Sequence, residues 1–156
     1  MKDEFRFIIS SDLDFEEMVI EITCEAQNFT GMILQENGLQ NLEFWIDLRG
    51  IPPREYIFNL DSFLQALEKG KSMAITQKNP EGTPERPNNL PCVSYEFLQE
   101  KKCYILRLGT EICGYVTHAS EKPQKIFIKK MVGTEFVKFD FFSLMHCLEK
   151  IRSFRD

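Results

Sequence analysis

Apolar residues near the carboxyl end of the chain recur at helical spacing. Five of them follow one another at intervals of one to three positions: Phe141, Leu144, Met145, Leu148 and Ile151. This spacing is typical of one apolar face of an α-helix. Asp140 stands in the position of an N-cap residue, and an extended pattern over 135–139 leads into it. We therefore predict a strand that runs directly into a helix, whose apolar face is buried against a sheet.

A second amphipathic helix is expected near the middle of the chain. The pattern places Asp61 at its N-cap and the apolar residues Phe63, Leu64 and Leu67 on its inner face. Gly70 is expected to end the helix in the C′ position, and the residues after it predict a further strand over 72–77.

Most of the remaining chain alternates apolar and polar residues, as half-buried strands do. Strands are predicted at 5–10, 18–26, 32–34, 42–48, 56–58, 92–98, 103–108, 112–118 and 126–130. Short turns separate most neighbours, so these strands can pair antiparallel. The predicted fold class is α+β, with antiparallel sheets made of strand meanders and two amphipathic helices covering them.

The two halves of the chain resemble each other. A shift of 81 positions places Phe58 on Phe139, Ser62 on Ser143, and the triplet Leu67-Glu68-Lys69 on Leu148-Glu149-Lys150. The shift suggests a duplicated unit of several strands followed by one helix. Coincidence is the alternative, because amphipathic helices often share such residues. The expected caps also disagree, since Asp61 falls on Phe142.

The length of 156 residues fits one domain, which we take to span 1–156. Within it, the two half-units occupy about 1–77 and 92–156. The connection between them, 78–91, carries four of the seven prolines and is expected to be exposed.

Composition favours a folded cytoplasmic protein. Hydrophobic residues make up 43% of the chain, and fourteen phenylalanines can supply a core. The charged amino end is not followed by an apolar stretch suited to a signal peptide or a membrane span. The five cysteines are odd in number and form no CxxC pair, which favours free thiols in a reducing compartment. The oligomeric state stays open, with a homodimer as one alternative.

Charge is distributed unevenly along the chain. The net charge is −5, but residues 1–26 carry −6 and residues 122–156 carry +4. The candidate binding residues of the acidic segment are Asp12, Asp14, Glu16, Glu17, Glu21 and Glu25. Three of them, Glu17, Glu21 and Glu25, are expected to share the outer face of one strand. Such a face can select a basic partner, or it can serve only solubility.

The sequence predicts no catalytic site, no cofactor and no metal site. The two histidines are His118 and His146, and His146 cannot act on its neighbour Cys147 because successive helix residues point about 100° apart. No His/Cys spacing is typical of a metal site. An enzyme of unfamiliar design stays open as an alternative, and it would need a perturbed carboxylate beside one histidine.

A late lysine–aromatic set suggests a second kind of binding function. Its members are Lys125, Phe127, Lys129, Lys130, Phe136, Lys138 and Phe139. Such a set can stack on bases and contact phosphates of a single-stranded nucleic acid. The isoelectric point near 5.2 opposes this interpretation, and the aromatic residues could equally belong to the core.

Four stretches carry a resemblance to a known family, namely 28–31, 42–49, 60–67 and 139–148. Their hydrophobic layout resembles that of small immunity proteins from bacterial toxin–immunity systems. The duplicated strands-then-helix plan is also similar to the Whirly arrangement, which some contact-dependent growth-inhibition immunity proteins share with single-strand-binding proteins. The resemblance implies a non-catalytic protein that covers the active site of a cognate toxin. Many such toxins are basic nucleases, which the acidic stretch could contact. Nucleic-acid binding is the alternative, and no membrane partner is expected.

Overall fold

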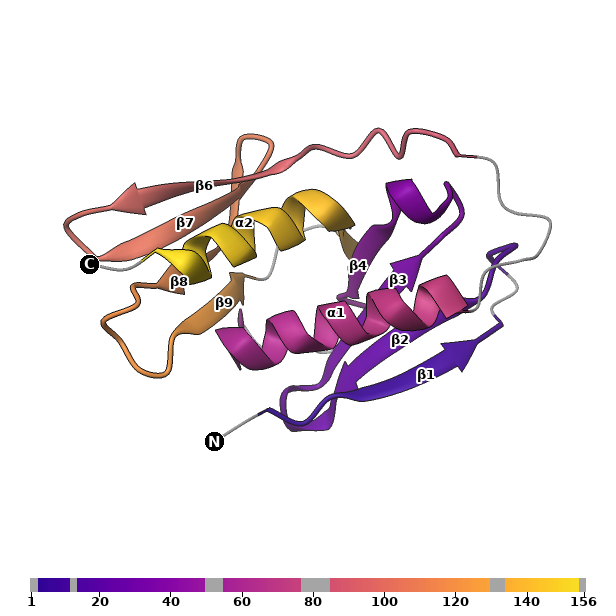
Figure 1. The fold of residues 1–156 in the computed structure, drawn as a ribbon, viewed down its shortest axis with the longest axis horizontal. Helices are drawn as coiled ribbons and strands as arrows, with labels where there is room; N and C mark the ends of the chain where they lie inside the picture. The colour runs from indigo at the N-terminus through magenta and orange to yellow at the C-terminus, as the bar shows by residue number, and fades with distance from the viewer. Residues whose placement is uncertain (1–2, 12–13, 50–54, 77–84, 130–133, 155–156) are drawn as a thin grey trace.

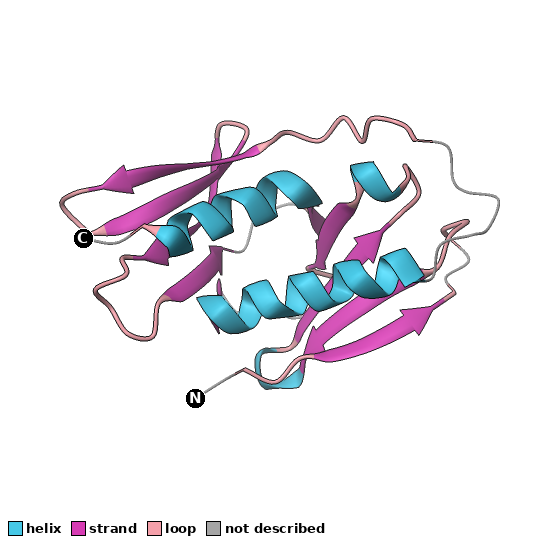
Figure 2. Ribbon diagram, viewed as in Figure 1, coloured by secondary structure: helices cyan, strands magenta, loops and turns pink. Residues whose placement is uncertain are grey.

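The computed structural model describes residues 3–11, 14–49, 55–76, 85–129 and 134–154. Two five-stranded antiparallel sheets and two α-helices make up the fold (Figures 1 and 2), which confirms the predicted α+β class. In spatial order, sheet A consists of β1 (Arg6–Ser10), β2 (Val19–Cys24), β3 (Phe29–Leu34), β4 (Glu43–Asp47) and β10 (Phe136–Asp140). Sheet B consists of β5 (Glu55–Asn59), β9 (Lys125–Lys129), β8 (Glu111–Thr117), β7 (Cys103–Leu108) and β6 (Val93–Leu98). The helices are α1 (Leu60–Thr76) and α2 (Phe141–Ser153), and two short 3-10 turns are η1 (Glu25–Gln27) and η2 (Leu39–Asn41).

The two sheets have the same plan and exchange their last strands. Strands β1 to β4 form one meander and β6 to β9 form the other. The strand that follows each meander joins the opposite sheet, so that β5 pairs with β9 and β10 pairs with β4. Each exchanged strand then runs without a turn into its helix (Figure 1). Neither predicted half-unit, 1–77 or 92–156, therefore contains all the strands of one sheet. The order of the strands along the chain does not show which strands pair.

The duplication extends to the helix caps. The backbone N–H of Ser62 donates to Asn59 Oδ1 at 3.2 Å, and that of Ser143 donates to Asp140 Oδ2 at 3.0 Å. Asn59 and Asp140 are 81 positions apart, as are the first residues of the two helices. The predicted cap Asp61 is wrong, because α1 begins directly after the strand and the last strand residue supplies the cap acceptor.

Two glycines mark equivalent positions in the middle strands of the two sheets. A Cβ on Gly31 of β3 would lie 2.7 Å from the ring of Phe44 on β4. A Cβ on Gly114 of β8 would overlap the carbonyl oxygen of Phe127 on β9. Both strands therefore need a residue without a side chain at this point. This shared requirement is independent of helix composition and favours duplication over coincidence.

The helices lie beside each other and cover one face of the sheets (Figure 1). Helix α1 contacts β2, β3, β5 and β9, and α2 contacts β6 and β10. The main core contains buried residues from both sheets and both helices. Neither helix in the described part of the chain has the length and apolar character of a membrane span.

Helix α1 is longer than the sequence pattern predicts. It continues through Gly70 to Thr76, so the strand predicted at 72–77 is wrong over its described residues. A Cβ on Gly70 would lie 2.6 Å from Ile33 Cδ1 and 3.0 Å from Ile22 Cδ1. Gly70 is thus present because the helix approaches sheet A closely, and it does not end the helix.

The described part of the proline-rich connection contacts the rest of the fold. Residues 77–84 lie outside the described residues. Beyond them, the Glu85 carboxylate accepts a hydrogen bond from Asn41 Nδ2 at 2.9 Å. Asn88 Nδ2 donates to Asp140 Oδ1 at 2.7 Å, so the cap of α2 is itself held by this connection.

Replacing Asn59 by alanine should lower the free energy of unfolding by about 1 kcal/mol, because the cap acceptor of α1 is lost. Asp140→Ala should cost at least as much, since Asp140 also accepts the hydrogen bond from Asn88. Urea unfolding followed by circular dichroism measures both. The matched control is Asp61→Ala, which removes an exposed first-turn carboxylate and should have a clearly smaller effect. Equal losses for the Asn59 and Asp61 variants would contradict the assignment.

Candidate functional site

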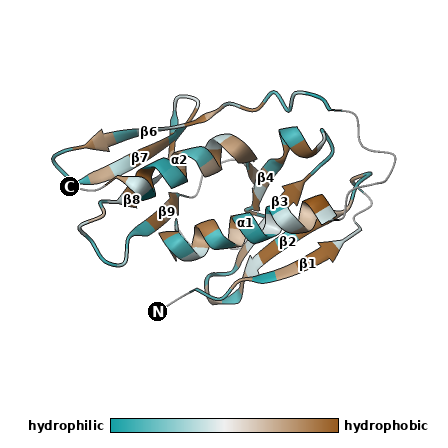
Figure 3. Ribbon diagram, viewed as in Figure 1, coloured by the Kyte–Doolittle hydropathy of each residue, from teal (hydrophilic) through white to brown (hydrophobic). Residues whose placement is uncertain are grey.

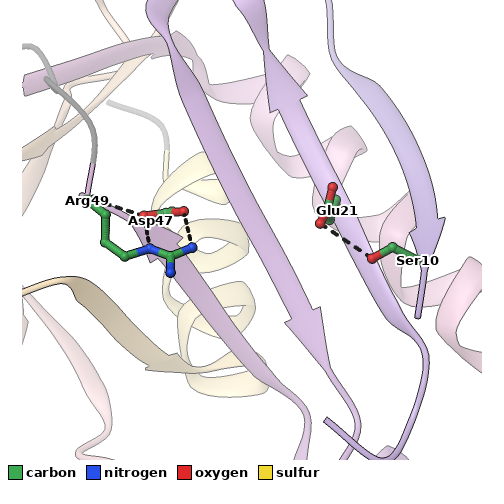
Figure 4. A network of polar contacts seen from close by, with 4 residues as sticks. All are labelled: Ser10, Glu21, Asp47 and Arg49. Atoms are coloured by element: carbon green, nitrogen blue, oxygen red, sulfur yellow. Dashed lines mark hydrogen bonds and ion pairs between the residues drawn. The ribbon is translucent and has the colours of Figure 1, made fainter. Parts of the chain in front are cut away.

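The face of sheet A turned away from the helices carries an apolar cluster of its own. Val19, Met32 and Leu34 are buried there, with Phe15, Trp45 and Phe136 packed against them. We call this surface the sheet A outer face, and Figure 4 looks onto it with the helices behind the strands. Its central row, read from the strand register, is Ile8, Glu21, Met32, Trp45 and Lys138.

Trp45 lies at the centre of this cluster and is held on several sides. Its ring packs edge-on against Phe15, with centroids 5.7 Å apart, and at a tilt against Phe136, with centroids 5.2 Å apart. The indole Nε1 donates to Glu43 Oε1 at 2.8 Å, and Lys138 Nζ lies 4.1 Å from the ring centroid. Trp45 is half-buried, so a fixed aromatic surface faces outward at this point.

An ion pair borders the cluster. Arg49 donates from Nε and Nη2 to the two carboxylate oxygens of Asp47, at 3.1 and 3.0 Å (Figure 4). The same guanidinium lies 4.7 Å from the ring centroid of Phe136. Burial acts to raise the pKa of Asp47, but the hydrogen bonds and charge of Arg49 outweigh it and lower the pKa below its ordinary value. Asp47 is therefore ionised at neutral pH.

The segment before β2 is fastened to this face by another carboxylate. The backbone N–H groups of Glu16 and Glu17 donate to Glu36 Oε1 and Oε2, at 2.6 and 2.9 Å. Phe15 packs against the cluster in the same segment. These contacts fix the backbone of this segment against sheet A, while the side chains of Asp14 and Glu16 remain exposed.

The six predicted binding residues do not form one strand row. Asp12 lies outside the described residues. Only Glu21 belongs to β2, where it accepts a hydrogen bond from Ser10 Oγ at 3.4 Å (Figure 4). Glu17 precedes the strand and Glu25 begins η1 beyond its other end. The expected row of Glu17, Glu21 and Glu25 is wrong because β2 is shorter than the alternating pattern.

Sequence reasoning missed further acidic residues of the same face. Glu43 and Asp47 on β4 flank Trp45 on the outer side, since Phe44 and Ile46 between them are buried. The alternation along β4 could have indicated their orientation. That they share a sheet face with Glu21, two strands away, could not be predicted, because it depends on the pairing of β2, β3 and β4.

The late lysine–aromatic set is divided between two surfaces. Lys125, Phe127 and Lys129 lie on β9 of sheet B, whereas Lys138 lies on β10 of sheet A. Phe139 is buried in the main core. Phe136 belongs to the sheet A outer face, and Lys130 lies outside the described residues. The continuous surface expected from the sequence is therefore not formed by the described members.

Sheet B has an outer face equivalent to that of sheet A. Its central row is Glu96, Ile105, Tyr115, Phe127 and Ile57. Phe127 occupies the position of Trp45 and stacks on Tyr115 with centroids 4.4 Å apart. A pocket of about 360 Å³ lies beside Tyr115, bordered by Lys101 and Lys102. The two faces thus share geometry and differ in side chains.

Of the cysteines, Cys103 lines the pocket on the outer face of sheet B, whereas Cys24, Cys113 and Cys147 are buried. All five cysteines are free. Burial raises the pKa of Cys113 to about 12 and also raises the pKa values of Cys24 and Cys147, so these thiols stay protonated at neutral pH. His118 stacks on Tyr104, with centroids 6.4 Å apart.

His118 also contacts a serine hydroxyl, which raises the question of nucleophilic chemistry. Ser120 Oγ lies 2.9 Å from His118 Nδ1, and the backbone N–H of Ser120 donates to the same nitrogen at 3.1 Å. The backbone N–H of Glu121 donates to the His118 carbonyl oxygen at 2.9 Å. These bonds all belong to one tight turn, and they stabilise its conformation. Within the described segments, no three His, Cys, Asp or Glu residues group to hold a metal ion.

Comparison with known proteins finds no family model, no curated protein and no solved structure that matches this chain. The resemblance to immunity proteins therefore stays a prediction that rests on the layout of the chain itself.

Replacing Arg49 by alanine should raise the pKa of Asp47. Without the guanidinium, burial still disfavours the ionised form, and only the backbone N–H of residue 49 still donates to Asp47 Oδ1, so the pKa should rise from its lowered value. Because the native pKa is lowered, Asp47 contributes stability at neutral pH that is lost as the pH falls through that pKa. This acid-sensitive contribution should be smaller in the variant. A ¹³C NMR titration of the Asp47 carboxyl measures the change.

The matched control is Arg107→Ala, which removes a similar ion pair with Glu96 on sheet B. It should leave the Asp47 titration unchanged. An unaltered Asp47 pKa in the Arg49 variant would show that the ion pair does not set it.

Proposed function

We propose that this chain is a non-catalytic cytoplasmic binding protein, an immunity protein that neutralises a cognate bacterial toxin by covering its active site. The sheet A outer face is the proposed contact surface. The observation that carries the proposal is the aromatic cluster around Trp45, which neither α1 nor α2 covers and which carboxylates border. The duplicated strand plan and the similarity to contact-dependent growth-inhibition immunity proteins of Whirly-like layout support it.

The composition of this face suits a protein partner. Tryptophan and arginine are enriched among the residues that dominate binding energy, and Trp45 and Arg49 lie on adjacent parts of the cluster. Trp45 is already held by Glu43, Phe15 and Phe136, so little side-chain freedom is lost when a partner binds. A fixed aromatic residue of this kind is suited to fill a pocket on the partner.

The charges of this face suit a basic partner. Glu21, Glu43 and Asp47 surround the cluster, and the docked segment adds Asp14 and Glu16. A toxin that binds nucleic acid presents basic groups around its active site, because it must contact phosphates. Acidic residues opposite these groups accelerate association and reject other partners. The acidic stretch is thus proposed to act in recognition, beyond any effect on solubility.

A single-stranded nucleic-acid binder is the second candidate function. The observation that favours it is the alternation of Lys125, Phe127 and Lys129 on the outer side of β9, next to Tyr115. Against it, Phe127 already stacks on Tyr115, and the other described members, Phe136, Lys138 and Phe139, lie on sheet A or in the core. Oligonucleotide binding at low salt that weakens steeply as salt is added would favour this candidate.

Trp45→Ala should weaken binding to the cognate toxin by about 30-fold or more, the effect expected of a central aromatic contact. The toxin to use is the polypeptide encoded immediately upstream, and calorimetry measures the affinity. The matched control is Phe127→Ala, at the equivalent position of sheet B, which should bind within about threefold of the unaltered chain. Loss of binding in the Phe127 variant alone would move the contact surface to sheet B, and absence of any complex with unaltered protein would refute the proposal.

Reversing the charges of Asp14, Glu16 and Glu21 to lysine should slow association with a basic toxin by about tenfold or more at low salt. The effect should shrink as salt is added, because these residues are exposed or half-buried. Stopped-flow mixing measures the rate. The control reverses Glu96 and Glu111 of sheet B and Glu121 in the turn between β8 and β9, which changes net charge equally. Equal slowing in both variants would indicate that overall charge, and not this face, attracts the partner.

A further inference from the structure

Strand β1 is a hydrophobic edge of sheet A. It is the first strand in the sheet order, and within the described residues it pairs only with β2 (Figure 1). Ile8 is 51% exposed and Ile9 is 36% exposed, and the end of the strand is coloured as hydrophobic in Figure 3. A hydrophobic edge strand with free backbone groups is a template for pairing with another chain.

An edge strand of the other sheet is protected by side chains. On β5, the Gln27 amide bonds to both the backbone N–H and the carbonyl oxygen of Ile57. Two residues further along, the N–H of Asn59 donates to Asp3 Oδ2 at 2.6 Å. These bonds occupy groups that would otherwise pair with an added strand.

Strand β6, the opposite edge of sheet B, is engaged by helix α2. The N–H of Val93 donates to Ser143 Oγ at 3.0 Å, and the Cys147 thiol donates to the Val93 carbonyl oxygen at 3.1 Å. No side chain of the described residues bonds in this way to the backbone of β1. Side chains therefore occupy backbone groups of Ile57 and Asn59 on β5 and of Val93 on β6, whereas no described side chain does so on β1. This difference leaves β1 available for pairing.

We propose that β1 pairs antiparallel with β1 of a second copy of this chain, around a two-fold axis that passes beside Ile8. In this register Ile8 faces Ile8 of the other copy, Phe7 faces Ile9, and Arg6 faces Ser10. The Ile8–Ile8 and Phe7–Ile9 pairs are branched-aliphatic or aromatic, which stabilise antiparallel strands, and no like charges oppose each other within the strand. The sequence of β1 is thus complementary to itself, which is the requirement of a two-fold interface.

The dimer joins two five-stranded sheets into one of ten strands. The axis is perpendicular to the sheet, so both outer faces lie on the same side. Arg6 of one copy then lies on the same side as Ser10 and Glu21 of the other, where a carboxylate can interact with it. The inference does not depend on the proposed toxin, because it rests on the edge strands alone.

Two charge variants at the self-facing position test this register. Ile8→Lys places like charges opposite each other, as does Ile8→Glu, and either should raise the dimer dissociation constant at least about tenfold. An equal mixture of the two variants should form a heterodimer, because opposite charges then face each other. Analytical ultracentrifugation from low micromolar to submillimolar concentration measures each sample of the full chain.

The matched control is Ile57→Lys, which makes the same change at an exposed residue of the protected edge β5 and should leave the dimer intact. The Ile8→Lys variant should keep its fold, since the introduced lysine faces Glu21 on β2. A chain that stays monomeric at submillimolar concentration would overturn the proposal. So would an Ile8→Lys variant that dimerises normally, or a mixture of the two variants that stays monomeric.

Discussion

The direct junction between an exchanged strand and its helix is the constraint on which the rest of the structure depends. Each helix begins where its strand ends, so the strand sets where the helix starts and which way it runs. The first N–H of each helix also bonds to the opposite half: Leu60 donates to the Gln124 carbonyl oxygen at 2.9 Å, and Phe141 donates to that of Leu42 at 3.0 Å. Each half therefore needs the other half's sheet to place its helix. Since both helices cover one side of the sheets, neither α1 nor α2 covers the opposite sides.

Local sequence signals were sufficient to predict much of the fold. They failed where two nearby residues could both act as the helix cap, and where a contact distant along the chain decided the role of a residue. The helix after Asp140 could be predicted because its cap, spacing and preceding strand agree. The cap of α1 was placed at Asp61, whereas Asn59 supplies the acceptor. Both residue types accept hydrogen bonds from a helix N-terminus, so residue type alone does not locate the cap. Gly70 resembles a helix end in sequence, yet its role is set by contact with sheet A, which is distant along the chain. The exchange of strands depends on which strands pair, namely β5 with β9 and β10 with β4. The alternation of apolar and polar residues does not specify these partners.

The candidate site was predictable only in part, for the same physical reason. The acidic character of the segment before β2 is visible in the sequence, and Glu21 does lie on the predicted outer side. The aromatic cluster was missed, because Met32, Trp45 and Phe136 come from three strands that meet only in the folded sheet. Conversely, the lysine–aromatic set looked continuous because β9 and β10 are neighbours in sequence, although they belong to different sheets. Adjacency along the chain is a weak guide to surfaces in a fold whose strands are exchanged.

The duplication supplies an internal comparison between surfaces of equal geometry. Trp45 and Phe127 occupy equivalent positions on the two outer faces, so the backbone and the strand pairing impose the same demands on both. Their neighbours nevertheless differ: Lys138 lies over Trp45, whereas the equivalent residue beside Phe127 is Ile57, which is 40% exposed. Folding requirements alone would allow similar residues at both places. The tryptophan held by a carboxylate and a lysine is present on one face only, and that asymmetry is the reason to assign recognition to the outer face of sheet A.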